Sequence, residues 1–327
     1  MATVPCDPAS GVDSPLRAEI SSGVGNLQLD RPAALNALSP ALVSALGATL
    51  LAWRDDPSVA RIVLQGNGGK AFSAGADVRA MWAHAQASDY DAINGYFAEE
   101  YAIDLMLARY PKDVIAIVDG LCFGGGMGLA VHSRFCIATE FASFSMPETL
   151  IGFFPDAGAT HFLSLPPGSI GLYLGMTGAR ISGPDAVHLG LASHFVSRSE
   201  LAAAIDIIVR EGIGGLVAAA PLPAFSLEPH RGVIDDCFSA GTVEEIFRRL
   251  QADGSEWARD TLAVLGQRSP ASLRWTFDSQ RAGASRSLEE CLKAELDLVA
   301  ISTAHPDFAE GVRAALVDKD KMPRWQS

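Results

Sequence analysis

The segment DGLCFGGGMGLAVHSRFCIATE, residues 119–140, decides the fold class of this chain. It overlaps the apolar run at 113–119, which is typical of a strand buried on both faces. The glycines from Gly124 onward predict a tight turn into a buried helix that ends near Arg134, and residues 135–139 have the pattern of a further strand. A strand, a helix and a strand in this order indicate a parallel crossover and therefore an α/β fold.

The residues before this segment show the same alternation. Residues 18–30 predict two short strands around a glycine-containing turn. Ser39 is the predicted cap of an amphipathic helix over 40–55, and residues 60–65 form another short apolar strand. Residues 78–110 are mostly helical in pattern, so that strands and helices continue to alternate.

The residues after 140 divide the chain into two parts. Helical patterns and a short strand that closes at Val196 complete a core domain expected over 17–200. Residues 210–232 are rich in Gly, Ala and Pro, as a connection would be. The rest of the second part, residues 201–327, is predicted to be helical, with helices over 242–251, 254–266, 270–282, 286–302 and 306–316.

The composition excludes several classes of protein. Of the 327 residues, 49% are hydrophobic and 19% are charged, which is typical of a globular protein and excludes a disordered or collagen-like chain. The 38 acidic and 25 basic residues give a net charge of −13. With that charge and no basic tract, nucleic acid is not an expected partner.

Cysteine use and the N-terminal residues bear on location. The five cysteines lie far apart and lack the spacing of metal ligands, which favours a reducing compartment and predicts no bound metal. The first 17 residues contain no apolar leader segment, and no run of 18 apolar residues occurs in the chain. We therefore expect a cytoplasmic protein without a membrane partner.

Two glycine-bearing segments are candidates for chemistry, since the sequence has no Walker A, GxGxxG, HExxH or GxSxG motif. KAFSAGADV, residues 70–78, follows the strand at 60–65, and GGGMG, residues 124–128, follows the strand at 114–118. Two such turns side by side could donate two N–H groups to one oxygen, which defines an oxyanion hole. The alternative is that the glycines only permit tight turns and close helix packing.

Two carboxylates stand in an otherwise apolar stretch. Glu148 follows the strand-like run at 141–144, and Asp156 comes eight residues later between Pro155 and Gly158. Burial raises the pKa of a carboxyl group toward values that suit proton transfer, so the two are candidates for an acid/base pair. The alternative is that both only cap turns at the surface.

Four segments in this order resemble the crotonase (enoyl-CoA hydratase/isomerase) superfamily: RPAALNAL (31–38), KAFSAGADVRAM (70–81), residues 119–140, and FSMPETLIGFFPDAGATHFL (144–163). The segments AEEYAID (98–104) and DFAEGVRAALVDKDKMPRW (307–325) are similar to the 3-hydroxyisobutyryl-CoA hydrolase subfamily. The resemblance implies a crotonase-like core of stacked ββα units with a helical C-terminal region.

The resemblance also implies roles for individual residues. The family's oxyanion hole falls on the main-chain N–H groups of Ala76 and Gly125, which agrees with the two glycine-bearing segments. Its catalytic carboxylates fall on Glu148 and Asp156, and a further substrate-contacting acid falls on Glu100. No separate cofactor is implied, because coenzyme A enters as part of the substrate. The residues expected to hold it, largely through main chain, are Ala33, Ala34, Ala74, Asp77 and Val78.

The activity implied is hydrolysis of a small acyl-CoA thioester, with 3-hydroxyisobutyryl-CoA of valine catabolism as the expected substrate. An enoyl-CoA hydratase or isomerase is the first alternative, although hydratases carry a second glutamate where this sequence has Gly128. The second alternative is a catalytically silent acyl-CoA binder. Proteins with such a core often form trimers or hexamers, so a homo-oligomer is expected unless the C-terminal tail folds back on its own core.

Overall fold

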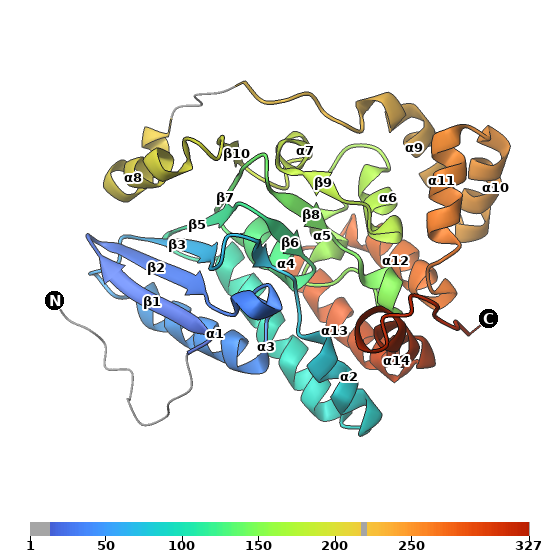
Figure 1. Ribbon diagram of the computed structural model, residues 1–327, viewed down its shortest axis with the longest axis horizontal. Coiled ribbons are helices and arrows are strands. Elements are labelled where there is room, and N and C mark those ends of the chain that lie inside the picture. The colour runs from blue at the N-terminus through green and yellow to red at the C-terminus, as the bar shows by residue number, and fades with distance from the viewer. Residues whose placement is uncertain (1–13, 217–220, 327) are drawn as a thin grey trace.

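A six-stranded sheet forms the centre of the computed structural model, which describes residues 14–216 and 221–326 (Figure 1). The strand order is β1-β2-β3-β5-β7-β10, and only the β1–β2 hairpin is antiparallel. These parallel pairings confirm the α/β class. The strands are β1 (Leu16–Ser21), β2 (Val24–Leu29), β3 (Arg61–Gly66), β5 (Asp113–Val118), β7 (Phe135–Ala138) and β10 (His194–Phe195).

A second, smaller sheet lies beside the first and was not predicted, because its strands are too short to show a pattern of their own. The predicted strand at 141–144 is found at 143–145, within this sheet. The order is β4-β6-β8-β9, with β4 (Ala71–Ser73), β6 (Leu121–Phe123), β8 (Ser143–Ser145) and β9 (Ile181–Ser182). The strand β4 lies within the first glycine-bearing segment, and β6 lies between β5 and the second one, so the second segment follows a short strand rather than the long strand that was predicted.

The helices of the core cover both faces of the larger sheet. Side chains alternate along each strand, so Ile62 and Leu64 join the larger apolar core while Val63 faces the smaller cluster under α8. Along the chain, a strand of the larger sheet, a strand of the smaller sheet and a helix follow one another repeatedly. This order confirms the stacked ββα units. The helices here are α1 (Pro40–Arg54), α2 (Val78–Gln86), α3 (Tyr90–Ala108), α4 (Gly125–His132), α5 (Ala159–Phe162), α6 (Ile170–Thr177), α7 (Gly183–His188) and α8 (Leu201–Glu211).

The C-terminal helices pack onto the core of their own chain. Ile234, Leu250, Val299 and Phe308 belong to the same continuous apolar core as the strands. Figure 1 shows these helices, in orange and red, on the side away from β1. None of the described helices is long and apolar enough to span a membrane. The C-terminal helices are α9 (Arg231–Phe238), α10 (Val243–Asp253), α11 (Glu256–Leu265), α12 (Pro270–Gly283), α13 (Leu288–Ala304) and α14 (Pro306–Val312).

Candidate active site

The two glycine-bearing segments meet because β4 and β6 are parallel neighbours and end at the same edge of the small sheet. A β-carbon built on Gly75, whose φ is +86°, would lie 2.9 Å from the carbonyl oxygen of Phe123 and 3.3 Å from the amide nitrogen of Gly125. No other residue fits here, since both the backbone conformation and the space require glycine. The side-by-side turns expected from the sequence are therefore present.

Two N–H groups are free at this junction. Leu38 bridges to the first segment: its N–H donates to the oxygen of Gly75 at 2.8 Å, and its oxygen accepts from the N–H of Asp77 at 3.1 Å. This pairing leaves the N–H of Ala76 unused, and Gly125 is the first residue of α4, whose N–H has no helical acceptor. Within the described residues neither N–H group donates a hydrogen bond, so both are available to one oxygen.

Asn36 holds the first segment in place and was missed by the sequence analysis. Its Nδ2 donates to the oxygens of Asn67 and Ala71, both at 2.9 Å, and its Oδ1 accepts from the N–H of Arg31 at 3.0 Å. The hydroxyl of Ser73 donates to the oxygen of Asn36 at 2.9 Å. This buried amide therefore ties the 31–38 segment to β4, next to the junction.

Glu148 lies beside the second segment, at the start of the 3-10 helix η2 (Glu148–Ile151). A β-carbon on Gly124, whose φ is +52°, would lie 2.8 Å from Oε1 of Glu148. The side chain is buried, and its Oε2 has no hydrogen-bond partner. Burial raises the pKa of Glu148 well above its ordinary value, and the charge of Asp156 raises it further.

Asp156 is also buried, and the hydroxyl of Tyr101 donates to its Oδ2 at 2.8 Å. Burial raises the pKa of Asp156, while the hydrogen bond from Tyr101 opposes that rise. The alternative that both carboxylates only cap turns at the surface is therefore wrong. The sequence did not predict a role for Tyr101, although it lies within AEEYAID.

Glu100 reaches the junction from α3. A β-carbon on Gly125 would lie only 1.8 Å from Oε1 of Glu100, so the carboxyl group sits directly over this glycine. Neither of its oxygens has a hydrogen-bond partner, and burial raises its pKa, as does the charge of Asp156. The sequence-predicted residues Ala76, Gly125, Glu148, Asp156 and Glu100 are thus brought together.

Asp104 adds a further carboxyl group, one helical turn after Glu100 on the same helix. It is fully buried, both of its oxygens lack partners, and burial raises its pKa well above the ordinary value. A β-carbon on Gly128 would lie 3.1 Å from Oδ1 of Asp104 and 2.8 Å from the β-carbon of Ala157. The helical spacing of Glu100 and Asp104 in AEEYAID was the signal that could have revealed it.

The cluster of Glu100, Asp104, Glu148 and Asp156 cannot be fully ionised. Within residues 14–216 and 221–326 no Lys, Arg or His forms an ion pair with any of the four. Neighbouring buried carboxyl groups share protons, so that one can act as an acid while another acts as a base. The described residues also contain no group of His, Cys, Asp and Glu that could hold a metal ion.

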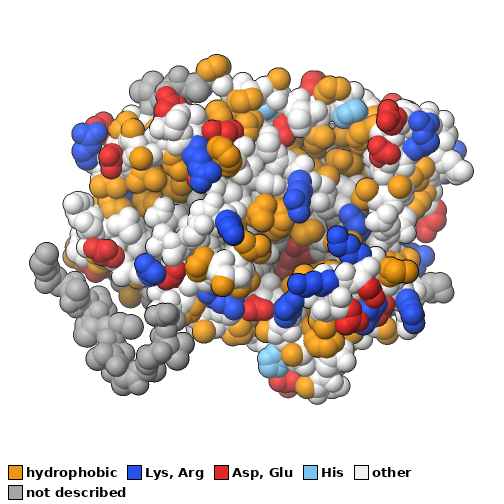
Figure 2. Space-filling view, viewed as in Figure 1, with side chains coloured by type: hydrophobic (Ala, Val, Ile, Leu, Met, Phe, Trp, Pro, Cys, Tyr) orange, Lys and Arg blue, Asp and Glu red, His pale blue; other side chains and the backbone are white. Residues whose placement is uncertain are grey.

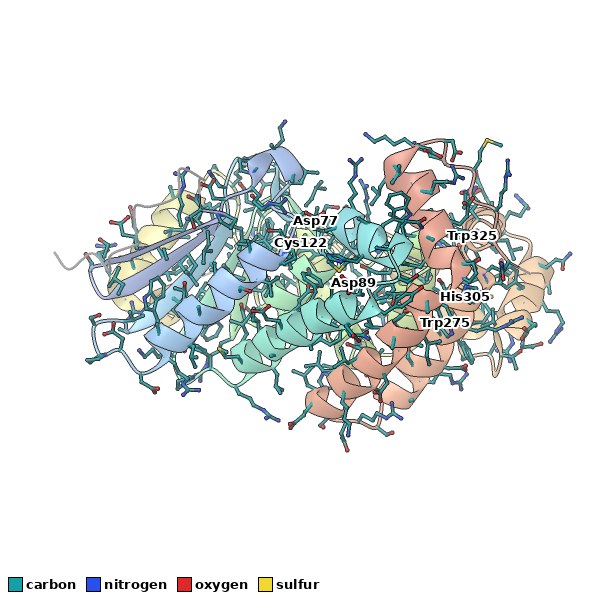
Figure 3. The ribbon with its side chains drawn as sticks, turned by 90° about the horizontal axis from the view of Figure 1, so that it is seen from below. Asp77, Asp89, Cys122, Trp275, His305 and Trp325 are labelled. Carbon is teal, nitrogen blue, oxygen red and sulfur yellow. The ribbon has the colours of Figure 1, made fainter. Side chains whose placement is uncertain are left out.

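The residues expected to hold coenzyme A lie in or beside the first glycine-bearing segment. Ala33 and Ala34 are exposed on the 3-10 helix η1 (Pro32–Ala34), and the N–H of Ala74 donates to the oxygen of Leu35 at 3.0 Å. Asp77 directly precedes α2, which begins at Val78, and it forms an ion pair with Arg31 at 3.1 Å. Figure 3 shows Asp77 and Cys122 near the middle of the molecule, where the core meets the C-terminal helices.

The face of the molecule over this region carries mixed charge. Figure 2 shows Lys and Arg side chains gathered around its middle, with acidic side chains lying deeper among them. An anion that approached this face would meet the basic groups first, in spite of the negative net charge of the chain.

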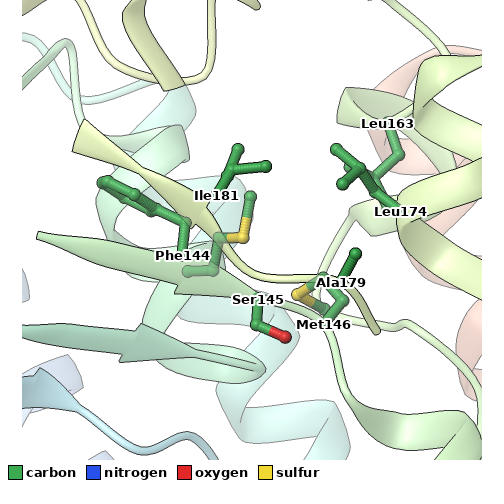
Figure 4. Close-up of a pocket in the computed structure, with 8 residues that line it drawn as sticks. Phe144, Ser145, Met146, Leu163, Leu174, Ala179 and Ile181 are labelled. Atoms are coloured by element: carbon green, nitrogen blue, oxygen red, sulfur yellow. The ribbon is translucent and has the colours of Figure 1, made fainter. Parts of the chain in front are cut away.

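A small, mostly apolar cavity lies among α4, α6, β8 and β9 (Figure 4). Its volume is about 10 Å³, which is room for roughly one water molecule and too little for an acyl group. Its lining consists of Met127, Phe144, Ser145, Met146, Leu163, Leu174, Ala179 and Ile181.

Comparison with known proteins places this geometry in context. Residues 24–327 match the family described as enoyl-CoA hydratase/isomerase. The chain is 39% identical over 317 residues to "3-hydroxyisobutyryl-CoA hydrolase, mitochondrial" of Gallus gallus, with 93% of this chain and 82% of that protein covered. It is also 39% identical to "3-hydroxyisobutyryl-CoA hydrolase 1" of Arabidopsis thaliana, with 96% and 87% covered. A solved enoyl-CoA hydratase from Rhodobacter sphaeroides 2.4.1 shares 36% identity and a TM-score of 0.91, with 96% and 93% covered.

The comparison corrects the expected location. The relative from Gallus gallus is named as mitochondrial, so the prediction of a cytoplasmic protein is wrong. That prediction rested on the spacing of the cysteines, on the composition of the first 17 residues and on the lack of a long apolar run, and residues 1–13 lie outside the part of the chain that the structure describes.

Proposed function

The chain belongs to the enoyl-CoA hydratase/isomerase family, and on this premise we propose that it hydrolyses 3-hydroxyisobutyryl-CoA to 3-hydroxyisobutyrate and coenzyme A. The observation that carries the proposal is the position of Glu148 beside Gly124, next to the free N–H groups of Ala76 and Gly125. The names of the relatives from Gallus gallus and Arabidopsis thaliana support the substrate.

The two N–H groups act on the thioester carbonyl oxygen. The oxygen becomes negatively charged when the carbonyl carbon is attacked, and donors already in place stabilise that charge without rearrangement. One such donor is worth about a hundredfold to a thousandfold in turnover. Ala76 and Gly125 therefore supply the electrostatic part of catalysis.

Glu148 starts the reaction and Asp156 completes the proton transfers. Glu148 attacks the carbonyl carbon and expels the coenzyme A thiolate, which leaves an anhydride that water hydrolyses, or it removes a proton from the water that attacks. Asp156 delivers a proton to the thiolate and recovers one from water. On either route one thioester and one water molecule give a carboxylate, a thiol and one proton. The two routes can be told apart with hydroxylamine, which traps Glu148 only when the anhydride forms.

Substrate binding uses the same junction. We assign the coenzyme A moiety to the main chain at Ala33, Ala34, Ala74, Asp77 and Val78, and the acyl moiety to contact with Glu100. The basic side chains on the face shown in Figure 2 favour the phosphates of coenzyme A. No further cofactor enters the proposed reaction.

A hydratase is the second candidate, since the Rhodobacter sphaeroides protein is named as one. The surroundings of Gly128 weigh against it. A β-carbon there would lie 2.8 Å from the β-carbon of Ala157 and 3.0 Å from its carbonyl oxygen, so a second glutamate has no room at this position. Addition of water by two glutamates is therefore less well supported than hydrolysis.

A panel of thioesters tests the proposal. Acyl groups of three to eight carbons, each with and without a 3-hydroxyl, are assayed for thiol release and, for the enoyl forms, for loss of the enoyl absorbance. The proposal expects the highest kcat/KM for thiol release from 3-hydroxyisobutyryl-CoA. Faster hydration of an enoyl-CoA than any thiol release would favour the hydratase, and binding without either reaction would favour the silent acyl-CoA binder.

Two further expectations stand as proposals. The chain divides into a catalytic core over 17–200 and a helical region over 201–327. A trimer or hexamer remains the proposed assembly, although the C-terminal helices pack onto the core of their own chain, an arrangement that favours a monomer. Sedimentation velocity on the purified protein tests the assembly, and a monomer at micromolar concentration would contradict it.

A further inference from the structure

Glu295, on the C-terminal helix α13, accepts hydrogen bonds from the segment that follows Asp156. Its Oε2 accepts from the N–H of Gly158 at 2.8 Å, and its Oε1 accepts from the N–H of Thr160 at 3.0 Å and from the hydroxyl of Thr160 at 2.5 Å. The side chain is 1% exposed. A carboxyl group that is 135 residues or more away along the chain thus holds two backbone N–H groups of this segment.

The segment needs such support because its backbone is strained. Ala157 has a φ of +55°, which is unfavourable for a residue with a β-carbon, and Gly158 follows with a φ of +82°. A β-carbon on Gly158 would lie 2.4 Å from Nε2 of His132. Strained backbone of this kind persists only where its surroundings hold it.

A second side chain completes the restraint from the other side. The ring nitrogen Nε2 of His132, on α4, donates to the oxygen of Ala157 at 3.0 Å. Burial lowers the pKa of His132 to about 4, so the ring is neutral and donates from Nε2. The helix that begins with Gly125 of the oxyanion hole and the C-terminal helix α13 therefore hold adjacent peptide groups of one segment.

We propose that Glu295 is a positioning residue for Asp156, and that it keeps the Asp156 carboxyl group in reach of the reacting thioester by fixing residues 157–160. The proposal rests on the proposed role of Asp156 in hydrolysis. Displacement of a reacting group by about 1 Å lowers turnover by as much as a hundredfold, so loss of this restraint reaches the chemistry although Glu295 does not touch the substrate.

The test combines Glu295→Gln with Asp156→Asn in a double-mutant cycle. The glutamine has the same size, but its amide nitrogen cannot accept a hydrogen bond, so at least one N–H of the segment loses its partner. We expect Glu295→Gln to lower kcat for thiol release by about tenfold with little change in KM, and to have no further effect in the Asp156→Asn background. Glu289→Gln, on the exposed surface of the same helix, is the matched control and should leave kcat unchanged.

Each outcome decides the matter. An equal loss in both backgrounds, or no loss in a folded Glu295→Gln protein, overturns the proposal and leaves the proposed function standing. Wild-type thiol release by Asp156→Asn overturns both. If Glu295→Gln does not fold, Thr160→Val replaces it in the cycle, because it removes only the hydroxyl donor; a loss of about threefold that is absent in the Asp156→Asn background is then the expected result.

Discussion

The core and the C-terminal helices contribute to the site in different ways. The core supplies every group assigned to the chemistry: the N–H groups of Ala76 and Gly125 and the carboxyl groups of Glu148 and Asp156. The C-terminal helices supply none of these, yet α13 holds the segment after Asp156 through Glu295. The reactive groups therefore come from local motifs of the core, while their positions depend on distant parts of the chain.

The helix α14 supports Glu148 in a similar way. A β-carbon on Gly152, just after η2, would lie 2.1 Å from the oxygen of Asp307, and one on Gly311 would lie 2.4 Å from the carbonyl carbon of Ile151. The backbones of α14 and of the segment that carries Glu148 are therefore in direct contact. The ring of Phe308 also packs against Phe153, with ring centroids 5.8 Å apart.

Glu148→Gln tests whether the core supplies the reactive groups, and it has the largest expected effect. The amide has nearly the same size but cannot act as a base or nucleophile, so we expect a loss of about a hundredfold or more in kcat with little change in acyl-CoA affinity. Thiol release and acyl-CoA binding are measured on one preparation. Glu99→Gln, an exposed neighbour of Glu100, is the control, and near wild-type turnover by Glu148→Gln would remove Glu148 from the mechanism.

Gly125→Ala tests the backbone part of the site. The structure places Oε1 of Glu100 1.8 Å from a β-carbon added at Gly125. We expect kcat/KM to fall by about tenfold to a hundredfold, because Glu100 and the N–H of Gly125 are both displaced. Gly95→Ala on α3, where a β-carbon meets no atom within 4 Å, should retain full activity. Full activity in both variants would exclude Gly125 from the oxyanion hole.

Gly311→Ala tests whether the C-terminal helix α14 positions Glu148. The added methyl group must separate α14 from the segment 148–152, so we expect a loss of about 1–3 kcal/mol in the free energy of unfolding. Turnover should fall about threefold to tenfold, through displacement of Glu148 rather than through any lost reactive group. Urea denaturation and thiol release measure the two effects. A destabilised protein with unchanged kcat would show that α14 stabilises the fold without positioning Glu148.

Asp104→Asn gives the smallest expected change in activity and a pH-dependent change in stability. Burial raises the pKa of Asp104 in the folded protein, while the pKa of an aspartate in the unfolded chain is about 4. Between these two pKa values the folded state binds a proton that the unfolded state lacks, so this group lowers the stability of the wild type as pH rises.

Asparagine does not titrate, so the melting temperature of Asp104→Asn relative to the wild type should increase from pH 5 to pH 8. Differential scanning calorimetry at both pH values measures this difference. Asp260→Asn, an exposed residue, should show no such trend. Parallel melting curves for Asp104→Asn and the wild type would show that Asp104 does not take up a proton on folding.

The sequence predicted the parts of the site that local patterns encode. The run at 119–140 correctly gave the strand, the glycine turn and α4, and the spacing of Glu148 and Asp156 marked them as a candidate pair. The small sheet was missed because strands of two or three residues show no periodicity. Glu295 could not be found, because its helix has an ordinary amphipathic pattern and its contacts depend on long-range packing.

The thiol-release rate of Asp156→Asn is the most direct test of the proposed hydrolysis mechanism. The melting temperature of this variant and its rate of enoyl-CoA hydration are measured on the same preparation. Because the amide cannot carry a proton between water and the leaving group, we expect hydrolysis of 3-hydroxyisobutyryl-CoA to fall by about a hundredfold. The amide has the same size and its oxygen can still accept from Tyr101, so the melting temperature should stay near that of the wild type. Hydration by Glu148 alone should change much less. Unchanged hydrolysis by a stable Asp156→Asn protein would contradict the proposed mechanism and favour a hydratase or isomerase.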